Sequence, residues 1–190
     1  MEFYTEPERR LPVSACADVI VAGAGPAGCA AAIAAARAGA KTILVEQFNC
    51  VGGMATGGMM SHFTGGTESP LFDEIEARVR SEKVGVFCPD QGAGPQEINH
   101  EVLKKVLFDM LTEAGVTLRL YTFVCGAVMD GNTVKGIITE SKSGRSVMTA
   151  KVVIDATGDG DVAAKAGAEF HIGRENDGKC QPVTLMFRIG

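Results

Sequence analysis

The sequence predicts an α/β domain in which a central parallel sheet with crossover helices continues into a three-stranded antiparallel meander. An apolar, β-branched run at Asp18–Ala22 is followed by an Ala-rich helical segment and a second such run at Lys41–Glu46, the pattern of a βαβ unit. Three later runs are separated by turns that contain glycine, as in antiparallel hairpins. The 190 residues, 46% of them hydrophobic, are enough to build one domain with a real core, or one domain and part of another.

Each element of the βαβ unit has a stop signal. Asp18–Ala22 stops at Gly23, as a buried parallel strand would. Gly25–Gly39 is small and apolar on nearly every side, so we expect a helix that packs tightly on two sides. Residues 1–16 are polar and mixed, and we expect them to form a lead-in segment outside the domain.

Further helices are expected at Leu71–Lys83 and Asn99–Glu113, where apolar residues follow the helical period. A Gly- and Pro-rich loop, Val84–Gln96, separates them. A strand at Val116–Tyr121 precedes the meander, and Val152–Asp155 is expected as a separate strand that returns to the parallel sheet. The three runs of the meander are Phe123–Met129, Thr133–Glu140 and Ser146–Ala150.

Charge and cysteine content exclude several classes of protein. The net charge is −5 with no basic block, so we expect no nucleic-acid partner. The six cysteines lie far apart without a C-x-x-C pair, which argues against a disulfide scaffold or a metal site and for reduced thiols in a cytoplasmic protein. The uncharged run Val19–Ala36 contains Gly and Pro and is barely hydrophobic in its second half, so we expect no membrane span.

The first motif is Gly23-Ala24-Gly25-Pro26-Ala27-Gly28, a G-x-G-x-x-G between the first strand and its helix. Gly23 permits the tight turn, Gly25 lets backbone N–H groups reach a pyrophosphate, and Gly28 lets the helix lie close to the strand. Glu46 closes the second strand, where a carboxylate can accept both hydroxyls of an adenosine ribose. Together these features predict a dinucleotide site.

Two more segments indicate which dinucleotide. Between Gly52 and Gly66, six of fifteen residues are glycine, which suits a ligand that continues past the pyrophosphate into a ribityl chain and a flat ring. A flexible surface loop is the alternative interpretation. Val153–Asp159 is a strand that ends in Ala-Thr-Gly, which places a small backbone segment near the crevice at the carboxyl ends of the strands.

From Asp18 to Gly190 the chain resembles the FAD-dependent oxidoreductase family, a branch of the glutathione-reductase-like flavoproteins related to fumarate reductase flavoproteins and thiazole synthases. The resemblance implies a Rossmann-like FAD-binding domain over residues 17–168 and the start of a substrate domain, apparently truncated, over residues 169–190. The segments that carry it are Asp18–Glu46, Gly52–Thr56, Val134–Arg145, Val152–Ala168 and Gln181–Gly190.

The resemblance also implies which residues hold FAD. Those around the ADP half are Gly23, Gly25, Pro26, Ala27, Gly28, Glu46 and Gln47. Those along the pyrophosphate and ribityl chain are Gly52, Gly53, Met54, Ala55 and Thr56. Adenine is expected near Phe123 and Val124, and the pyrophosphate is expected to be flanked by Ala156, Thr157 and Gly158.

The activity that the resemblance implies is hydride or electron transfer between a small-molecule substrate and FAD. No cysteine pair follows Gly52-Gly53, so a dithiol mechanism is not expected. His62 lies in a Ser-His-Phe-Thr stretch similar to one where fumarate reductase relatives link FAD to His, but the next residues differ, which favours a non-covalent role or simple loop structure. Arg174 is a candidate anchor for an anionic substrate, with a solvated turn as the alternative.

Two other function classes remain open at this point. One is a module that binds FAD or NAD without turnover, and the other is a group-transfer enzyme on the same fold, similar to thiazole synthases or tRNA-modifying flavoproteins. The expected partners are a small-molecule substrate and a C-terminal substrate domain or complementary chain. Without that part, we expect weaker FAD retention and little turnover from these 190 residues. No oligomeric state is predicted.

Overall fold

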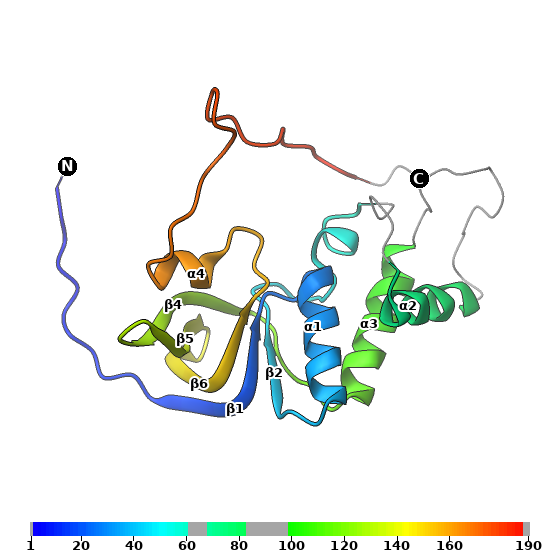
Figure 1. The fold of residues 1–190 in the computed structure, drawn as a ribbon, viewed down its shortest axis with the longest axis horizontal. Helices are drawn as coiled ribbons and strands as arrows, with labels where there is room; N and C mark the ends of the chain where they lie inside the picture. Colours follow the sequence, from blue (N-terminus) through cyan, green and yellow to red (C-terminus); the bar gives the residue numbers. More distant parts are fainter. Residues whose placement is uncertain (1, 61–67, 83–98, 188–190) are drawn as a thin grey trace.

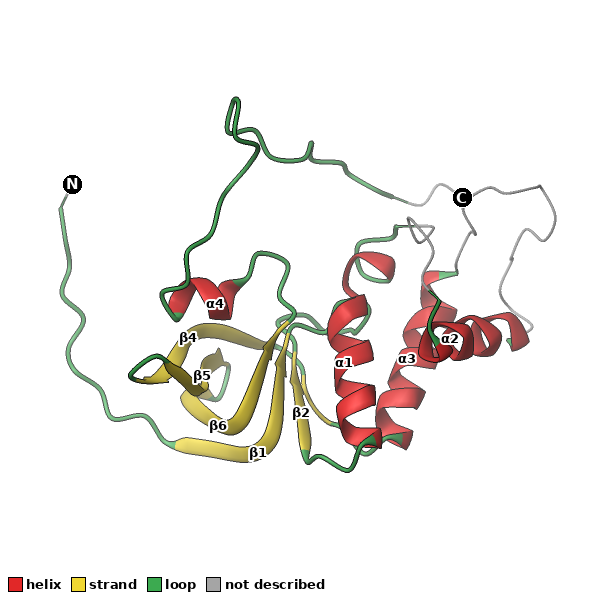
Figure 2. Ribbon diagram, viewed as in Figure 1, coloured by secondary structure: helices red, strands yellow, loops and turns green. Residues whose placement is uncertain are grey.

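A computed structural model describes residues 2–60, 68–82 and 99–187, and their strands form a six-stranded sheet in the order β3-β2-β1-β6-β5-β4 (Figure 1). The first four strands in this order are parallel, whereas β5 is antiparallel to both of its neighbours, β6 and β4 (Figure 2). The expected fold class is confirmed. The strands are β1 (Val13–Ala22), β2 (Thr42–Val45), β3 (Thr117–Arg119), β4 (Thr122–Asp130), β5 (Thr133–Ser141) and β6 (Gly144–Asp155).

Helices cover both faces of the sheet, with α1, α2 and α3 together on one side and α4 next to β4 on the other (Figure 1). α1 contacts both the sheet and α3, as its small apolar residues predict. Asn99 begins α3, because its side-chain oxygen accepts the N–H groups of Glu101 and Val102 at 3.0 and 3.3 Å. The helices are α1 (Pro26–Arg37), α2 (Pro70–Ser81), α3 (His100–Glu113) and α4 (Asp161–Lys165), with a 3₁₀ turn η1 (Gly53–Ala55).

The core consists of two clusters, one on each face of the sheet. Successive residues of a strand point to opposite faces, so Val21 packs with the cluster under α1 and α3, whereas its neighbour Ile20 packs with the cluster on the other face. Leu44 and Ile43 divide in the same way on β2. Burial on both faces explains why these strands are continuous apolar runs. Within the described ranges, no helix has the length and apolar character needed to cross a membrane.

The parallel sheet and the meander share one strand. Ser146–Ala150 and Val152–Asp155, predicted as two strands, form the single strand β6. β6 pairs with β5 in antiparallel fashion near its start and with β1 in parallel fashion from Val147 onward. Lys151, which interrupts the apolar pattern, stays in the strand while its ammonium pairs with Asp18 at 2.7 Å.

One strand boundary and one short helix also differ from the prediction. β1 begins at Val13, so residues 13–16 belong to the sheet instead of the lead-in segment. Val13 suits a strand, but Ala15 does not favour one. The conformation of this segment follows from pairing with β6, next to which Val147 donates its N–H to the carbonyl of Pro12 at 2.9 Å. α4 was not predicted because five residues are too short for a visible helical period. The loop expected at 84–96 lies outside the described residues.

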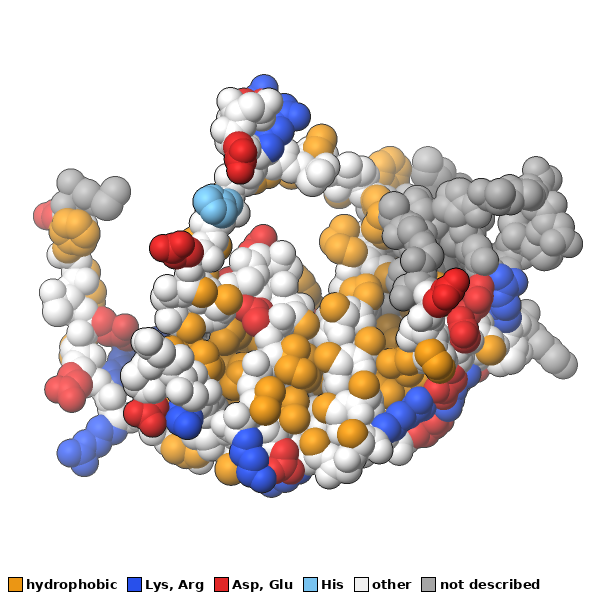
Figure 3. All heavy atoms as spheres, viewed as in Figure 1, with side chains coloured by type: hydrophobic (Ala, Val, Ile, Leu, Met, Phe, Trp, Pro, Cys, Tyr) orange, Lys and Arg blue, Asp and Glu red, His pale blue; other side chains and the backbone are white. Residues whose placement is uncertain are grey.

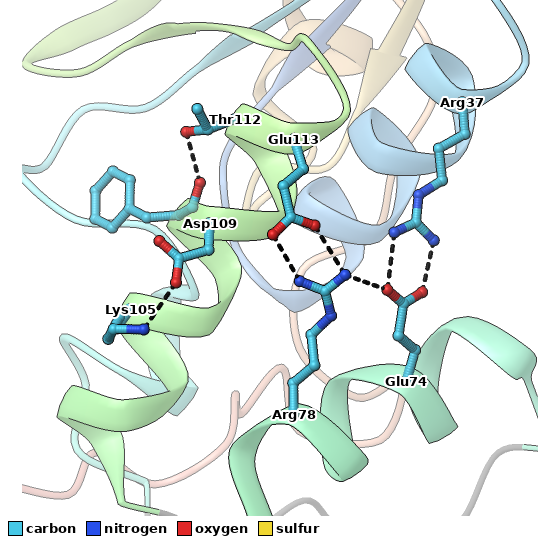
Figure 4. Close-up of polar contacts among 8 residues, drawn as sticks. Arg37, Glu74, Arg78, Lys105, Asp109, Thr112 and Glu113 are labelled. Carbon is cyan, nitrogen blue, oxygen red and sulfur yellow. Dashed lines mark hydrogen bonds and ion pairs between the residues drawn. The ribbon is translucent and has the colours of Figure 1, made fainter. Parts of the chain in front are cut away.

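Charged side chains link the three helices of one face (Figure 4). Glu74 on α2 accepts two hydrogen bonds from Arg37 on α1, at 2.6 and 2.9 Å, and one from Arg78 at 2.8 Å. Arg78 also donates to Glu113 on α3 at 2.9 Å. The hydrogen bonds from Arg37 foremost, and then the one from Arg78, lower the pKa of Glu74 to about 2 against the opposing effect of burial.

Because this pKa is depressed in the folded protein, the ionised form of Glu74 stabilises the fold. Its contribution is complete well above the ordinary pKa of 4.5 and is lost as the pH falls from there toward about 2. We expect Glu74→Gln to lower the free energy of unfolding by about 1 kcal/mol near neutral pH, and the difference from wild type to shrink below pH 4.5. Urea denaturation of both proteins across this pH range measures the difference in the free energy of unfolding.

Glu76→Gln is the matched control, since Glu76 pairs with Arg80 on the same helix, at 2.8 Å. We expect Glu76→Gln to lower the free energy of unfolding by less than Glu74→Gln does. Equal losses for the two variants at all pH values would show that the contacts between helices contribute nothing extra.

Candidate functional site

A cleft of about 610 Å³ lies at the carboxyl ends of β1, β2 and β6. In open α/β sheets this edge is where ligands bind, because loops leave neighbouring strands in opposite directions there. The lining residues come from five segments: Gly23–Ala27, Val45–Cys50, Gly53–Gly58, Thr122–Val124 and Ala156–Asp161. The turn after β1, the loop after β2 and the segment after β6 therefore meet around one space.

Glu46 is held in the cleft wall through both its side chain and its backbone. One carboxylate oxygen accepts the N–H of Ala24 at 2.7 Å, and the other accepts the N–H of Phe48 at 2.9 Å. Its backbone is bonded too, to Arg119 of β3 at 2.8 Å and to Thr122 of β4 at 2.9 Å. With 6% of its surface exposed, Glu46 ties the glycine turn to the loop after β2. It is therefore part of the fold as well as of the cleft wall.

The glycines of the first motif have two separate roles. A Cβ at Gly23 would lie 2.6 Å from the carbonyl oxygen of Ala156, and one at Gly28 would lie 1.8 Å from the carbonyl oxygen of Gly23. These two positions bring backbone segments into contact. A Cβ at Gly25 or Gly158 would meet no atom within 4 Å. Both of these line the cleft, so their missing side chains leave room for a ligand.

The glycine-rich loop folds back on the same turn. Gly52 donates its N–H to the carbonyl of Ala24 at 2.7 Å, and a Cβ at Gly53 would lie 2.9 Å from the Cα of Gly25. The Thr56 hydroxyl donates to the carbonyl of Val51, and this side chain is 2% exposed. The described part of this loop is thus packed against the cleft.

Most of the residues expected to hold FAD line the cleft. Those that do are Gly23, Gly25, Pro26, Ala27, Glu46, Gln47, Gly53, Met54, Phe123, Val124, Ala156, Thr157 and Gly158. Four others, Gly28, Gly52, Ala55 and Thr56, lie behind the wall, where they pack or hydrogen-bond the segments that form it. The motif glycines and the residues after the Gly-Gly doublet therefore include both lining and supporting positions.

Sequence reasoning missed nine lining residues. They are Val45, Phe48, Asn49, Cys50, Gly57, Gly58, Thr122, Asp159 and Asp161. All lie within a few residues of a predicted position, so extending each motif along the loop that follows its strand would have found them. Phe48 is the most notable, because it brings a large apolar side chain to the cleft lining and is 61% exposed.

The two candidate catalytic residues are not part of this arrangement. His62 lies outside the described residues. Arg174 is exposed and donates to both carboxylate oxygens of Asp177, at 2.6 and 2.7 Å, in a turn that does not line the cleft. The solvated-turn interpretation agrees with this geometry, and a substrate-binding role of Arg174 stays a prediction.

The described lining of the cleft contains three carboxylates, Glu46, Asp159 and Asp161, and no Lys, Arg or His. In the space-filling view the Lys and Arg side chains gather along the periphery of the visible face and on the projecting segment (Figure 3). Positive potential comes instead from the N-terminus of α1, where no described side chain caps the helix. The N–H groups of Ala27 and Gly28 precede the first intrahelical bond, which Cys29 makes to Gly25 at 2.9 Å.

The two glycine roles can be separated by substitution. Gly28→Ala would normally favour a helix, but its Cβ would meet a fixed carbonyl, so we expect a loss of about 1–3 kcal/mol in the free energy of unfolding. Gly25→Ala should change it by less than about 0.5 kcal/mol, because φ at this position is −65° and the space is open. Denaturant midpoints measure both, and equal midpoints would contradict the assignment.

Known proteins with similar sequences include a thiazole synthase and a fumarate reductase. The thiamine thiazole synthase of Aeropyrum pernix is 30% identical over 183 residues, which cover 88% of this chain and 62% of that protein. The fumarate reductase (cytochrome) of Shewanella frigidimarina is 38% identical over 93 residues, which cover 47% of this chain and 15% of that protein. The chain thus spans less than two thirds of the length of either relative.

Among solved structures, THI4 from Thermovibrio ammonificans superimposes with a TM-score of 0.63 at 20% identity, over 79% of this chain and 61% of that one. This likeness concerns the fold. The family model described as FAD dependent oxidoreductase matches residues 18–190, nearly the whole sequence. The sequence, the fold and this match agree, and the chain belongs to the FAD-dependent oxidoreductase family.

Proposed function

We propose that the cleft binds FAD in an extended conformation and that the chain forms the FAD-binding part of an oxidoreductase that acts on a small-molecule substrate. The observation that carries this proposal is the open space at Gly25 and Gly158 beside the uncapped N-terminus of α1. A pyrophosphate needs backbone N–H donors and no intervening Cβ, and both conditions are met at the same place.

The residues around the ADP half fit this ligand. Glu46 uses one acceptor position on each carboxylate oxygen for the N–H groups of Ala24 and Phe48. Each oxygen has a second lone pair, which we assign to the ribose hydroxyls. Phe48 and Phe123, 61% and 48% exposed, line the cleft, and we assign their apolar surface to the adenine.

The other end of the cleft accommodates the ribityl chain and ring. Gly53, Gly57 and Gly58 present backbone there, and Met54 adds an apolar side chain. Bound FAD would supply electron transfer with a substrate. The protein's own contribution is to orient the cofactor by backbone contacts and to exclude water with its apolar walls. A binder without turnover and a group-transfer enzyme would use the same cleft, so they are separated by experiment.

We further propose that residues 169–190 begin the substrate-binding part of the protein. Residues 169–187 run along one side without helix or strand (Figure 1). Their apolar side chains Val183, Leu185 and Phe187 are 99%, 84% and 68% exposed, which suits residues that contact a further part of the protein. We also infer a cytoplasmic location, supported by the free thiols of the five described cysteines.

FAD titration of the purified chain, followed by flavin absorbance and fluorescence, tests the proposed function. We expect saturable binding and a loss of at least about tenfold in affinity for Gly25→Val, whose side chain would occupy the open space. Ala34→Val on the exposed side of α1 is the matched control. Anaerobic bleaching of the bound flavin by a reduced donor separates an oxidoreductase from a passive binder. Absence of FAD binding would refute the proposal.

The negative charge of the cleft lining leads us to predict how the Kd for FAD depends on salt. If backbone N–H groups alone hold the pyrophosphate, raising NaCl from about 0.1 M to about 1 M, which shortens the Debye length from about 10 Å to about 3 Å, removes no favourable ion pair. It also screens repulsion from Glu46, Asp159 and Asp161. We therefore expect the Kd for FAD to stay constant or fall with salt. Screening of the α1 dipole alone would raise the Kd by no more than about fivefold, so a larger rise would indicate a cation at the phosphate.

A further inference from the structure

Asp155, the last residue of β6, has a carboxylate engaged on both oxygens. Oδ1 accepts the N–H of Thr157 at 3.1 Å and its hydroxyl at 2.7 Å, while Oδ2 accepts the N–H of Ala163 in α4 at 2.8 Å. The Thr157 hydroxyl in turn accepts the N–H of Asp161 at 2.7 Å. One carboxylate therefore fixes both the Ala156–Gly158 segment and the start of α4.

This segment is in direct backbone contact with the glycine turn. Ala156 donates its N–H to the carbonyl of Ala22 at 2.9 Å. Its own carbonyl faces Gly23, where even a methyl group would be only 2.6 Å away. Its Cβ lies 3.3 Å from where a Cβ on Gly28 would be. A displacement of Ala156 would therefore push on the turn that begins α1.

We propose that Asp155 is a positioning residue of the cofactor cleft, which holds the Ala156–Gly158 wall and, through Ala156, the Gly23–Gly28 turn at their working separation. This inference rests on the proposed FAD site. Asp155 does not line the cleft, whereas Ala156, Thr157 and Gly158 do, so its effect on FAD is indirect. Although burial acts to raise it, the pKa of Asp155 is lowered by the hydrogen bonds from Ala163 and Thr157.

The same bonds define what Thr157 can contribute. Its hydroxyl proton is donated to Asp155, and its oxygen accepts the N–H of Asp161. Its N–H donates to Asp155 as well, so both donors of Thr157 serve to shape the wall. Removing either the Asp155 carboxylate or the Thr157 hydroxyl should loosen the same segment.

Asp155→Asn tests the proposal, because an amide keeps one acceptor oxygen and turns an NH₂ group toward a backbone N–H that needs an acceptor. Asp18→Asn is the matched control. Asp18 also accepts a backbone N–H, from Lys41 at 2.9 Å, and pairs with Lys151, but outside the cleft lining. We expect Asp155→Asn to raise the Kd for FAD about tenfold and Asp18→Asn to leave it within about twofold, at comparable thermal stability.

Amide hydrogen exchange on the chain without FAD gives an independent readout. We expect Asp155→Asn to accelerate exchange at Ala156 and Gly23 as well as at Ala163, and Asp18→Asn to affect only the region of Lys41. Thr157→Val should reproduce the Asp155→Asn pattern, and the double variant should add little, since both changes break one network. Thr157→Val also carries the test if Asp155→Asn fails to fold.

Exchange that changes only at Ala163, or a Kd equal to that of Asp18→Asn, would overturn the proposal. If the unsubstituted chain binds no FAD, the proposed function fails. The exchange data then decide alone whether Asp155 holds the two walls together.

Discussion

Backbone-to-backbone contact around the turn after β1 is the constraint on which the cleft depends. The carbonyl of Ala156 abuts Gly23, the carbonyl of Gly23 abuts Gly28, and the Cα of Gly25 faces Gly53. A side chain at any of these contacts would separate segments that must touch. The Glu46 carboxylate then bonds the same turn to the loop after β2. The N–H groups of the α1 N-terminus are thereby oriented before any ligand arrives, which reduces the entropic cost of binding.

The sequence predicts those features whose physical cause is local. Gly23, Gly25 and Gly28 stand out because positive φ, close approach and open space each require the absence of a Cβ, and the requirement is visible in the residue type itself. The βαβ unit is predicted for a similar reason, because strands buried on both faces have to be continuously apolar. The glycine motifs and strand ends therefore predict the cleft and most of its lining.

Features that depend on distant partners could not be predicted in the same way. The first residues of β1 form a strand because β6 lies beside them. In the sequence β6 looks interrupted at Lys151, because the ion pair of Lys151 with Asp18 is visible only in the structure. The lining position of Phe48 follows from the path of its loop, which Glu46 sets by bonding its N–H. Likewise, nothing in the residue type of Thr157 reveals that its hydroxyl is already used. Side-chain roles in the cleft thus need the tertiary structure.

The strand shared by the two halves of the sheet has a consequence for how the protein is made. Ser14 on β1 and Ser146 on β6 lie side by side, with their hydroxyl oxygens 3.0 Å apart, although 132 positions separate them in the chain. During synthesis β1 therefore waits for a neighbour on one side until β6 has been made, and its open edge can pair wrongly in the meantime. Such non-local pairing slows folding. Among the strands of the described sheet β6 comes last in the sequence, so the cleft that we propose for FAD stays incomplete until β6 and the segment after it have left the ribosome.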